Sequence, residues 1–254
     1  MIEGIMQELT IIGSSNAIPT RDRDNCYLSL KTHERFILID CGSNALVRLM
    51  ESGMHADQIT EMIITHFHPD HVAGLPLLLM DLWLLGRQRP LFIYGLEDCL
   101  SRVEKMMDLF GWKNWPSFFQ VGFSTIPEFT STIIKDDFIA ITSVPVKHLI
   151  PTIGLRVESQ NKPFIIAYTC DTEPCEGVDE LSRGANILIH ESAGAAVGHS
   201  SAEQAGADAA RAEVDQLVLI HYPDSQMDEQ LINEASLHYG GLIHVAKDGM
   251  KFSW

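Results

Sequence analysis

The sequence predicts an α/β protein in which two β-sheets pack face to face with helices outside them, giving a four-layer αββα sandwich. Strand-like segments separated by turn signals occur in both halves of the chain, and helical patterns alternate with them. The 254 residues, 46% of them hydrophobic, are enough to bury a substantial core. Because no linker or low-complexity segment separates the halves, we expect one domain over residues 1–254.

The first half of the chain is predicted to be mostly sheet. The expected strands cover residues 8–13, 26–31, 35–39, 61–65 and 91–94. Helices are expected over residues 72–86 and 97–110. The apolar helix from residue 72 is shorter than the ~20 residues that a membrane span requires, and Asp81 interrupts it, so we interpret it as a buried helix.

The second half repeats this alternation. Strands are expected over residues 138–146, 152–157, 164–169, 187–189 and 217–220. A helix is expected over residues 202–212, and the chain should end with a helix and a hairpin. Strands and helices therefore interleave in both halves, as the layered prediction requires.

The cysteines and the N-terminus indicate a reducing compartment. The five cysteines are scattered without Cys-x-x-Cys spacing, so we interpret them as reduced core thiols and none as a metal ligand: Cys26, Cys41, Cys99, Cys170 and Cys175. Residues 1–8 carry two glutamates and no basic segment before an apolar run, which does not resemble a secretory signal. We expect a cytoplasmic protein with no membrane partner.

The charge balance restricts the expected partners. Eighteen basic residues against thirty-four acidic ones leave a formal charge of −16, and this field disfavours long nucleic acids, including a transfer RNA precursor. Two bound divalent ions would reverse the sign locally. A small anionic substrate is therefore compatible with the composition.

The most informative segment is residues 65–71, which read Thr-His-Phe-His-Pro-Asp-His after an apolar run. Side chains two apart on an extended segment point the same way, so His66 and His68 are placed to share one metal ion. Pro69 then turns the chain, which lets Asp70 and His71 serve a second ion. Polar groups buried there without partners would cost ~1–3 kcal/mol each, so the pattern favours a metal site over chance.

Further candidate ligands follow other predicted strands. His148, Asp171 and His221 each come directly after or close to the end of an apolar run. Histidines and carboxylates without thiolates suit zinc, and also manganese or iron, and leave a position open for water. We therefore expect two divalent metal ions in a catalytic site rather than a closed structural one.

The full series of motifs resembles the metallo-β-lactamase superfamily, and within it the ribonuclease Z-like branch. The superfamily motifs are matched at residues 38–42, residues 66–71, His148, residues 168–172 and His221. The branch is indicated by residues 13–20, residues 190–192 and residues 198–202. The resemblance spans nearly the whole chain and implies a four-layer fold of the metallo-β-lactamase type.

This resemblance assigns roles to the candidate residues. It implies that one metal is held by His66, His68 and His148, and the other by Asp70, His71 and His221, with Asp171 bridging them. It also implies that Asp40 orients a ligand from outside the coordination shell. Two further residues are assigned by it to the chemistry, His199 at the scissile phosphate or leaving group and Glu191 beside it.

The function that these residues predict is hydrolysis of a small phosphodiester by a hydroxide that bridges the two metal ions. Asp70 would orient the nucleophile while it ligates, and His199 would donate a hydrogen bond or proton to the departing oxygen. The family also suggests a homodimer. The aromatic residues 110–119 are interpreted equally well as a pocket, a subunit contact or core.

Four alternatives stay open. A transfer RNA 3′-end processing endoribonuclease would need a basic surface, although no basic inserted arm is present; the candidates are Arg21, Arg23, Arg87 and Arg89. The same two-metal centre would also suit hydrolysis of a carboxylic ester, thioester, lactone or sulfate ester. A redox di-iron protein is disfavoured because that branch of the family usually has glutamate where His68 stands. A non-catalytic interaction module would not need every ligand.

Overall fold

The computed structural model describes residues 7–254, which divide into two compact units. Unit 1 contains the described residues up to Gly13, residues 24–126 and residues 248–254, and unit 2 contains residues 14–23 and 127–247. Most of the segment on which we based the absence of a secretory signal lies outside the described residues. The expectation of a single domain stays a prediction.

Unit 1 contains a seven-stranded sheet within its described residues, in the order β14-β1-β2-β3-β4-β5-β6. Strands β1, β2, β3 and β14 pair antiparallel, whereas β3 to β6 run parallel. The strands are β1 Glu8–Gly13, β2 Tyr27–Lys31, β3 Phe36–Ile39, β4 Glu61–Ile63, β5 Leu91–Leu96, β6 Val121–Ile126 and β14 Lys251–Ser253. The helices are α1 Ala45–Glu51, η1 Ala56–Gln58, α2 Pro69–Val72, α3 Leu75–Leu84, α4 Glu97–Leu109 and η2 Trp112–Asn114.

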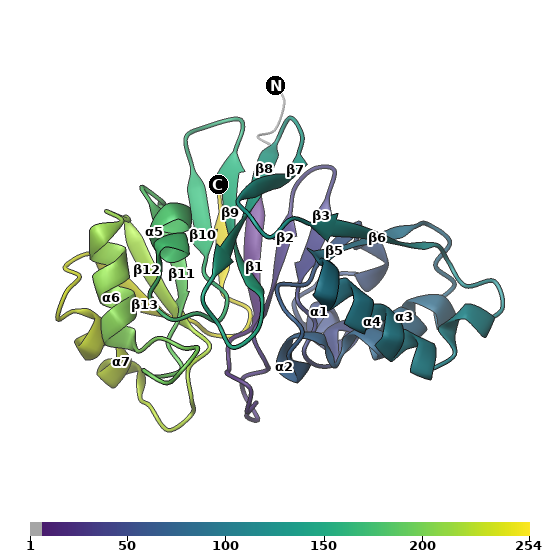
Figure 1. Ribbon diagram of the computed structural model, residues 1–254, viewed down its shortest axis with the longest axis horizontal. Coiled ribbons are helices and arrows are strands. Elements are labelled where there is room, and N and C mark those ends of the chain that lie inside the picture. The colour runs from purple at the N-terminus through teal and green to yellow at the C-terminus, as the bar shows by residue number, and fades with distance from the viewer. Residues whose placement is uncertain (1–6) are drawn as a thin grey trace. The chain divides into compact units, whose positions relative to one another are not determined.

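Unit 2 contains a second seven-stranded sheet, in the order β13-β12-β11-β10-β9-β8-β7. Strands β7 to β10 pair antiparallel and β10 to β13 run parallel. The strands are β7 Ser131–Lys135, β8 Ile139–Val146, β9 Thr152–Ser159, β10 Ile165–Tyr168, β11 Ile187–Glu191, β12 Gln216–Ile220 and β13 Leu242–Val245. The helices α5 Glu176–Ser182, α6 Ala202–Arg211 and α7 Asp228–Ala235 lie along this sheet (Figure 1).

The core of each unit is made by its apolar strands and the helices that pack on them. The short apolar strands are buried almost throughout, as in β3, β11 and β12. Helix α6 packs its alanine-rich face on the sheet of unit 2, where Ala205 and Ala209 lie in one buried cluster with Leu188 and Leu217. Parallel strands buried on both faces present their side chains as continuous apolar runs, so polar functional groups are left for the strand ends.

One expectation about the elements is wrong and one is met in part. The chain does not end in a hairpin, because β13 extends the parallel sheet of unit 2 and β14 pairs antiparallel with β1 in unit 1. The helix expected over residues 72–86 is present as α3, preceded by the short helix α2, but it is buried on one face only, since Leu77 and Leu84 are exposed. Gly74 separates the two, and its backbone lies so close to the Ser43 carbonyl that a Cβ would meet that oxygen at 1.7 Å.

Within residues 7–254, no helix is both long and apolar enough to cross a membrane. The five cysteines are free thiols, and four of them are buried, as the core interpretation predicts.

Candidate metal centre

In unit 1 the candidate ligands follow β4, next to a buried carboxylate that follows β3. Asp40 is completely buried and has a left-handed backbone, with φ of 64°. Its Oδ1 accepts a hydrogen bond from the Thr65 backbone N–H and its Oδ2 accepts from the Thr65 hydroxyl, both at 2.8 Å. Because β3 and β4 are parallel neighbours, their carboxyl ends meet at one edge of the sheet. This pairing places Asp40 under the histidine segment.

Asp40 also sets which nitrogen of two histidines carries the proton. Nδ1 of His71 lies 2.8 Å from Asp40 Oδ2, and a carboxylate only accepts, so His71 donates through Nδ1. The Thr65 hydroxyl gives its proton to Asp40 and therefore accepts from His66 Nδ1, which lies 3.1 Å away. Both rings are left with the Nε2 lone pair that binds a metal.

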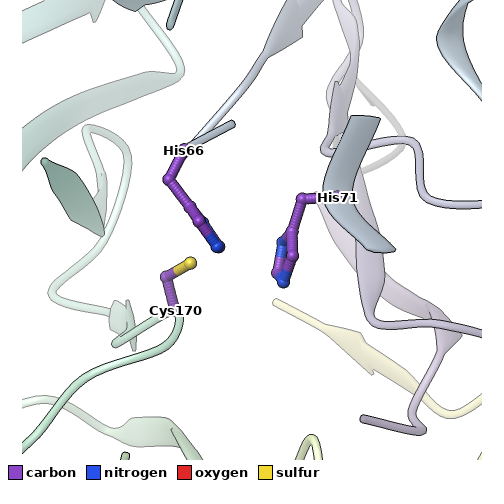
Figure 2. A group of neighbouring side chains, drawn as sticks. All are labelled: His66, His71 and Cys170. Carbon is purple, nitrogen blue, oxygen red and sulfur yellow. The ribbon is translucent and has the colours of Figure 1, made fainter. Parts of the chain in front are cut away.

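The spacing of the donor atoms in unit 1 fits a metal ion. Nε2 of His66 lies 3.1 Å from Nδ1 of His68. Two nitrogens on one tetrahedral ion at ~2.0–2.1 Å would lie about 3.3 Å apart. The rings of His66 and His71 lie side by side with centroids 4.1 Å apart (Figure 2), and Asp70 Oδ2 lies 3.6 Å from His71 Nε2. Three imidazoles and a carboxylate form a donor set that suits zinc, manganese or iron.

In unit 2 the candidate ligands also stand at strand ends. His148 follows β8, Asp171 follows β10 and His221 follows β12. Asp171 Oδ2 lies 3.9 Å from His148 Nε2 and 3.5 Å from His221 Nε2, so one carboxylate oxygen faces both rings. Burial lowers the pKa of His148, which favours the neutral form that ligates.

His199 stands beside these residues and is oriented by Glu191. His199 Nδ1 donates to Glu191 Oε1 at 2.9 Å, and the buried Glu191 carboxylate also accepts from the backbone N–H groups of Thr172 and Ala193. The His199 ring lies 4.9 Å from that of His148 and 5.7 Å from that of His221. The groups His148, Asp171, His199 and Glu191, His199, His221 each bring three donor atoms within 4.8 Å of one another.

Three residues that are candidates or adjoin candidates have left-handed backbones although they are not glycine. They are Asp40 with φ of 64°, Cys170 with φ of 55° and His221 with φ of 56°. Each stands directly after a strand or next to a candidate ligand; Cys170, drawn in Figure 2, precedes Asp171. Such conformations cost roughly 1–2 kcal/mol per residue and are concentrated at functional sites.

His190 bonds groups inside unit 2 and is not among the candidate metal ligands. Its Nε2 lies 3.0 Å from Asp208 Oδ2 and its Nδ1 donates to the Glu191 carbonyl at 2.7 Å. Burial lowers the pKa of His190, but Asp208 and the Glu191 carbonyl outweigh burial and raise it. The buried pair joins β11 to α6.

Two of the four arginines proposed for RNA contact are buried and bond other groups of the protein. Arg87 is buried and donates to the carbonyls of Asp57, Ile59, Arg89 and Pro90. Arg23 is buried too; it donates to the Tyr222 carbonyl and pairs with Asp224. Arg21 and Arg89 are exposed. Two of the four candidates are therefore structural, because buried guanidinium groups need these acceptors.

The aromatic residues 110–119 divide between core and surface. Trp112 and Phe119 are buried, whereas Phe110 is exposed. Trp115 stacks on Trp83 of α3 with centroids 5.0 Å apart. This pair, with Phe110 and the exposed face of α3, lines a cavity of about 450 Å³. The segment therefore forms a pocket wall as well as part of the core.

Sequence reasoning assigned no role to three residues that hold the candidates in place. Thr65 connects His66 to Asp40, and its position just before His66 was a readable signal. Glu173 and Gly198 hold the loop before His199; Gly198 begins the motif at residues 198–202 but was given no role of its own, and Glu173 belongs to no recognisable ligand pattern. The predicted sharing of metals between the ligands of unit 1 and those of unit 2 stays a prediction.

Known proteins share this fold and sequence pattern. Ribonuclease Z of Mycobacterium marinum is 30% identical, covering 96% of this chain and 97% of that protein. The metallo-β-lactamase fold protein YhfI from Bacillus subtilis superposes with a TM-score of 0.85 at 21% identity, covering 98% and 100% of the two chains. Human tRNase Z, short form, superposes with a TM-score of 0.75 at 24% identity, covering 96% and 98%. The fold and the donor set define a metal-dependent hydrolase of the metallo-β-lactamase type with a ribonuclease Z-like sequence, and the predicted fold class is confirmed.

The model of the family described as anti-Pycsar protein Apyc1 matches residues 7–239, and the chain belongs to that family. The match covers nearly the whole of both units. Since relatives named ribonuclease Z match along almost the full chain, the expectation that its acidity disfavours transfer RNA is not supported.

Proposed function

We propose that the protein hydrolyses small phosphodiesters with two divalent metal ions, preferably zinc. The observation that carries the proposal is that each unit holds a group of oriented side chains. Asp40 and Thr65 fix the His66 and His71 rings with Nε2 available for a metal. Glu191 fixes His199 as a donor next to His148. Oriented metal ligands and a directed proton donor each accelerate ester hydrolysis.

The residues have distinct tasks in this proposal. One ion would be held by His66, His68 and His148 and the other by Asp70, His71 and His221, with Asp171 serving both. The ions, when bound, supply Lewis-acid charge and an activated water. Asp70 orients the attacking group, and His199 gives a hydrogen bond or a proton to the departing oxygen. Glu191 acts through His199, since its carboxylate is buried and bonded to that ring.

The test is to determine metals per chain in the purified protein and to assay bis(p-nitrophenyl) phosphate and a transfer RNA precursor in the same preparation. His66→Ala is the inactivating variant, and His238→Ala is the control, because the His238 side chain is exposed and its ring bonds Glu203 on the surface of unit 2. About two metals with metal-dependent cleavage of the small diester supports the proposal. Bound metals without cleavage of either substrate would refute it and redirect the search to carboxylic or sulfate esters.

Processing of transfer RNA is the second candidate function, and the similarity to proteins named ribonuclease Z favours it. Cleavage of the precursor at its 3′ trailer would establish it. The exposed Arg21 and Arg89 are then the first residues to replace, whereas replacing the buried Arg87 would test stability instead. The cytoplasmic location stays a prediction.

We also propose that the chain forms a homodimer through exposed apolar side chains of unit 1. Large apolar side chains are exposed on its helices or directly after them, at Val47, Met50, Leu77, Leu84, Leu85, Leu109 and Phe110. Exposed patches of this kind mark interfaces, and a twofold pair covers the same face on both copies. In sedimentation, Leu84→Glu with Leu85→Glu should yield monomers, while Leu237→Glu in unit 2 should not. A wild-type monomer would exclude the dimer.

A further inference from the structure

The peptide of Gly198 is shared by two parts of the candidate site. Its carbonyl accepts a hydrogen bond from His148 Nδ1 at 2.6 Å, which leaves the Nε2 atom of His148 for a metal. Its N–H donates to Glu173 Oε1 at 2.8 Å. Gly198 is buried and directly precedes His199 in the chain. Any shift of this peptide therefore moves the His199 backbone and changes the support of His148.

Glu173 is itself fixed to the end of β8. Its backbone N–H donates to the Lys147 carbonyl at 2.7 Å, and its Oε2 lies 2.7 Å from Lys147 Nζ. Lys147 directly precedes His148, and Glu173 follows Asp171 by two residues.

The loop before His199 has an exposed middle and a tightly fitted end. Residues 195–197 are exposed, with Val197 at 77%. Gly198 has φ of 86°, and a Cβ there would lie 2.9 Å from Leu149 Cγ and 3.0 Å from His148 Nδ1. Beyond His199, the Ser200 hydroxyl donates to the Thr172 carbonyl at 2.7 Å. The residue before His199 is thus held by the Glu173 side chain, and the residue after it, Ser200, is held by its own hydrogen bond.

We propose that Glu173 is a positioning residue for the hydrolytic reaction, because its hydrogen bond to the Gly198 N–H holds the peptide that places His199 and supports His148. The role assigned to His199, donation to the departing oxygen, rests on the proposed function. Glu173 acts entirely through the loop. The rate of leaving-group departure is therefore measured on metal-saturated protein, so that a change in the support of His148 does not enter the comparison.

The kinetic test compares Glu173→Ala, Glu173→Gln and Glu203→Ala as metal-saturated proteins on methyl aryl phosphates with p-nitrophenyl, p-chlorophenyl and phenyl leaving groups. Poor leaving groups need a proton donor most, so Glu173→Ala should lower kcat for the phenyl ester on the order of 10- to 100-fold, the effect of a misplaced group. The loss for the p-nitrophenyl ester should be below about threefold, since that leaving group departs with less help. Glutamine keeps an oxygen that accepts from the Gly198 N–H, so the kcat of Glu173→Gln should stay within about threefold of the wild-type value for all three esters. Glu203 is an exposed glutamate of α6 that bonds His238, and its replacement should change nothing.

A second readout does not depend on activity. Hydrogen–deuterium exchange over residues 193–199 should accelerate in Glu173→Ala and stay near wild type in Glu173→Gln. An equal loss of kcat for all three esters, or unchanged exchange in Glu173→Ala, would overturn the proposal. If the wild type cleaves no diester, the proposed function fails, and exchange alone then decides whether Glu173 holds the loop.

Discussion

Replacing Asp40 by asparagine tests how far one buried carboxylate controls the metal site. Asp40 accepts three hydrogen bonds, from the Thr65 N–H, the Thr65 hydroxyl and His71 Nδ1. An asparagine has one oxygen and one NH₂ group, so in either orientation its NH₂ faces a donor. If NH₂ faces His71, the imidazole moves its proton to Nε2 to accept the new bond, and its metal-binding lone pair is lost.

The magnitude follows from the desolvation of these groups. A buried donor left without an acceptor costs about 1–3 kcal/mol. Since tenfold in an equilibrium constant is about 1.4 kcal/mol, this corresponds to a loss of metal affinity of roughly 5- to 150-fold. Removal of groups that orient metal ligands typically lowers affinity 10- to 100-fold. We therefore expect Asp40→Asn to lower metal affinity by about that range.

The assay is competition for zinc against a chromogenic chelator, with thermal unfolding measured on the same samples. Asp208→Asn is the matched control, because Asp208 is also buried and also bonds an imidazole, that of His190. Asp208→Asn should lower the melting temperature but leave the zinc affinity within about threefold of the wild-type value. If Asp40→Asn loses stability to the same extent as the control and keeps its zinc affinity, Asp40 does not orient the ligands and our reasoning is refuted.

Three further predictions concern residues of unit 2. His199→Ala should lower kcat on methyl phenyl phosphate, whose leaving group is poor, by up to about 10²–10⁴-fold with the metal content intact; loss of metal would contradict its role as donor. Gly198→Ala should lower Tm by roughly 2–8 °C, because a left-handed alanine costs about 1–2 kcal/mol and its Cβ meets His148 and Leu149; an unchanged Tm in calorimetry would show that the loop relaxes. The His190–Asp208 pair should stabilise the fold most between the unperturbed pKa of Asp, about 3.9, and that of His, about 6.5. His190 has a raised pKa, so its contribution is lost as pH rises through that value, while Asp208 has a lowered pKa, so its contribution is lost as pH falls through it. The Tm difference between wild type and Asp208→Asn should therefore shrink toward alkaline pH, and a difference that grows there would exclude the charged pair.

The unit 1 ligands could be identified from sequence because the information is local. The segment after β4 alternates histidines over an extended backbone and then turns at Pro69, so spacing alone indicates which side chains meet. The contact of Thr65 with Asp40 could not be read in this way, because it depends on the parallel pairing of β3 with β4 across 25 residues. Glu173 was missed for the same reason, since its partner Gly198 lies 25 residues away.

Elements with weak local patterns were also missed or misplaced. Helices α1 and α5 have seven residues each, too short for the helical period to stand out. The expected hairpin was wrong because a turn, such as the one at Gly249 with φ of 83°, changes the direction of the chain without determining which sheet the next strand joins. Strand β14 finds its partner at the other end of the chain, in β1.

The left-handed residues at the site have an evolutionary consequence. Glycine at Cys170 or His221 would relieve backbone strain and should make the apoprotein more robust, but it would loosen Asp171 in the first case and delete a ligand in the second. Consensus or stability-driven redesign would therefore tend to erode the site at these positions. Metal binding offsets the strain by mass action, so the lifetime of the folded chain against proteolysis should depend on how much metal its surroundings supply.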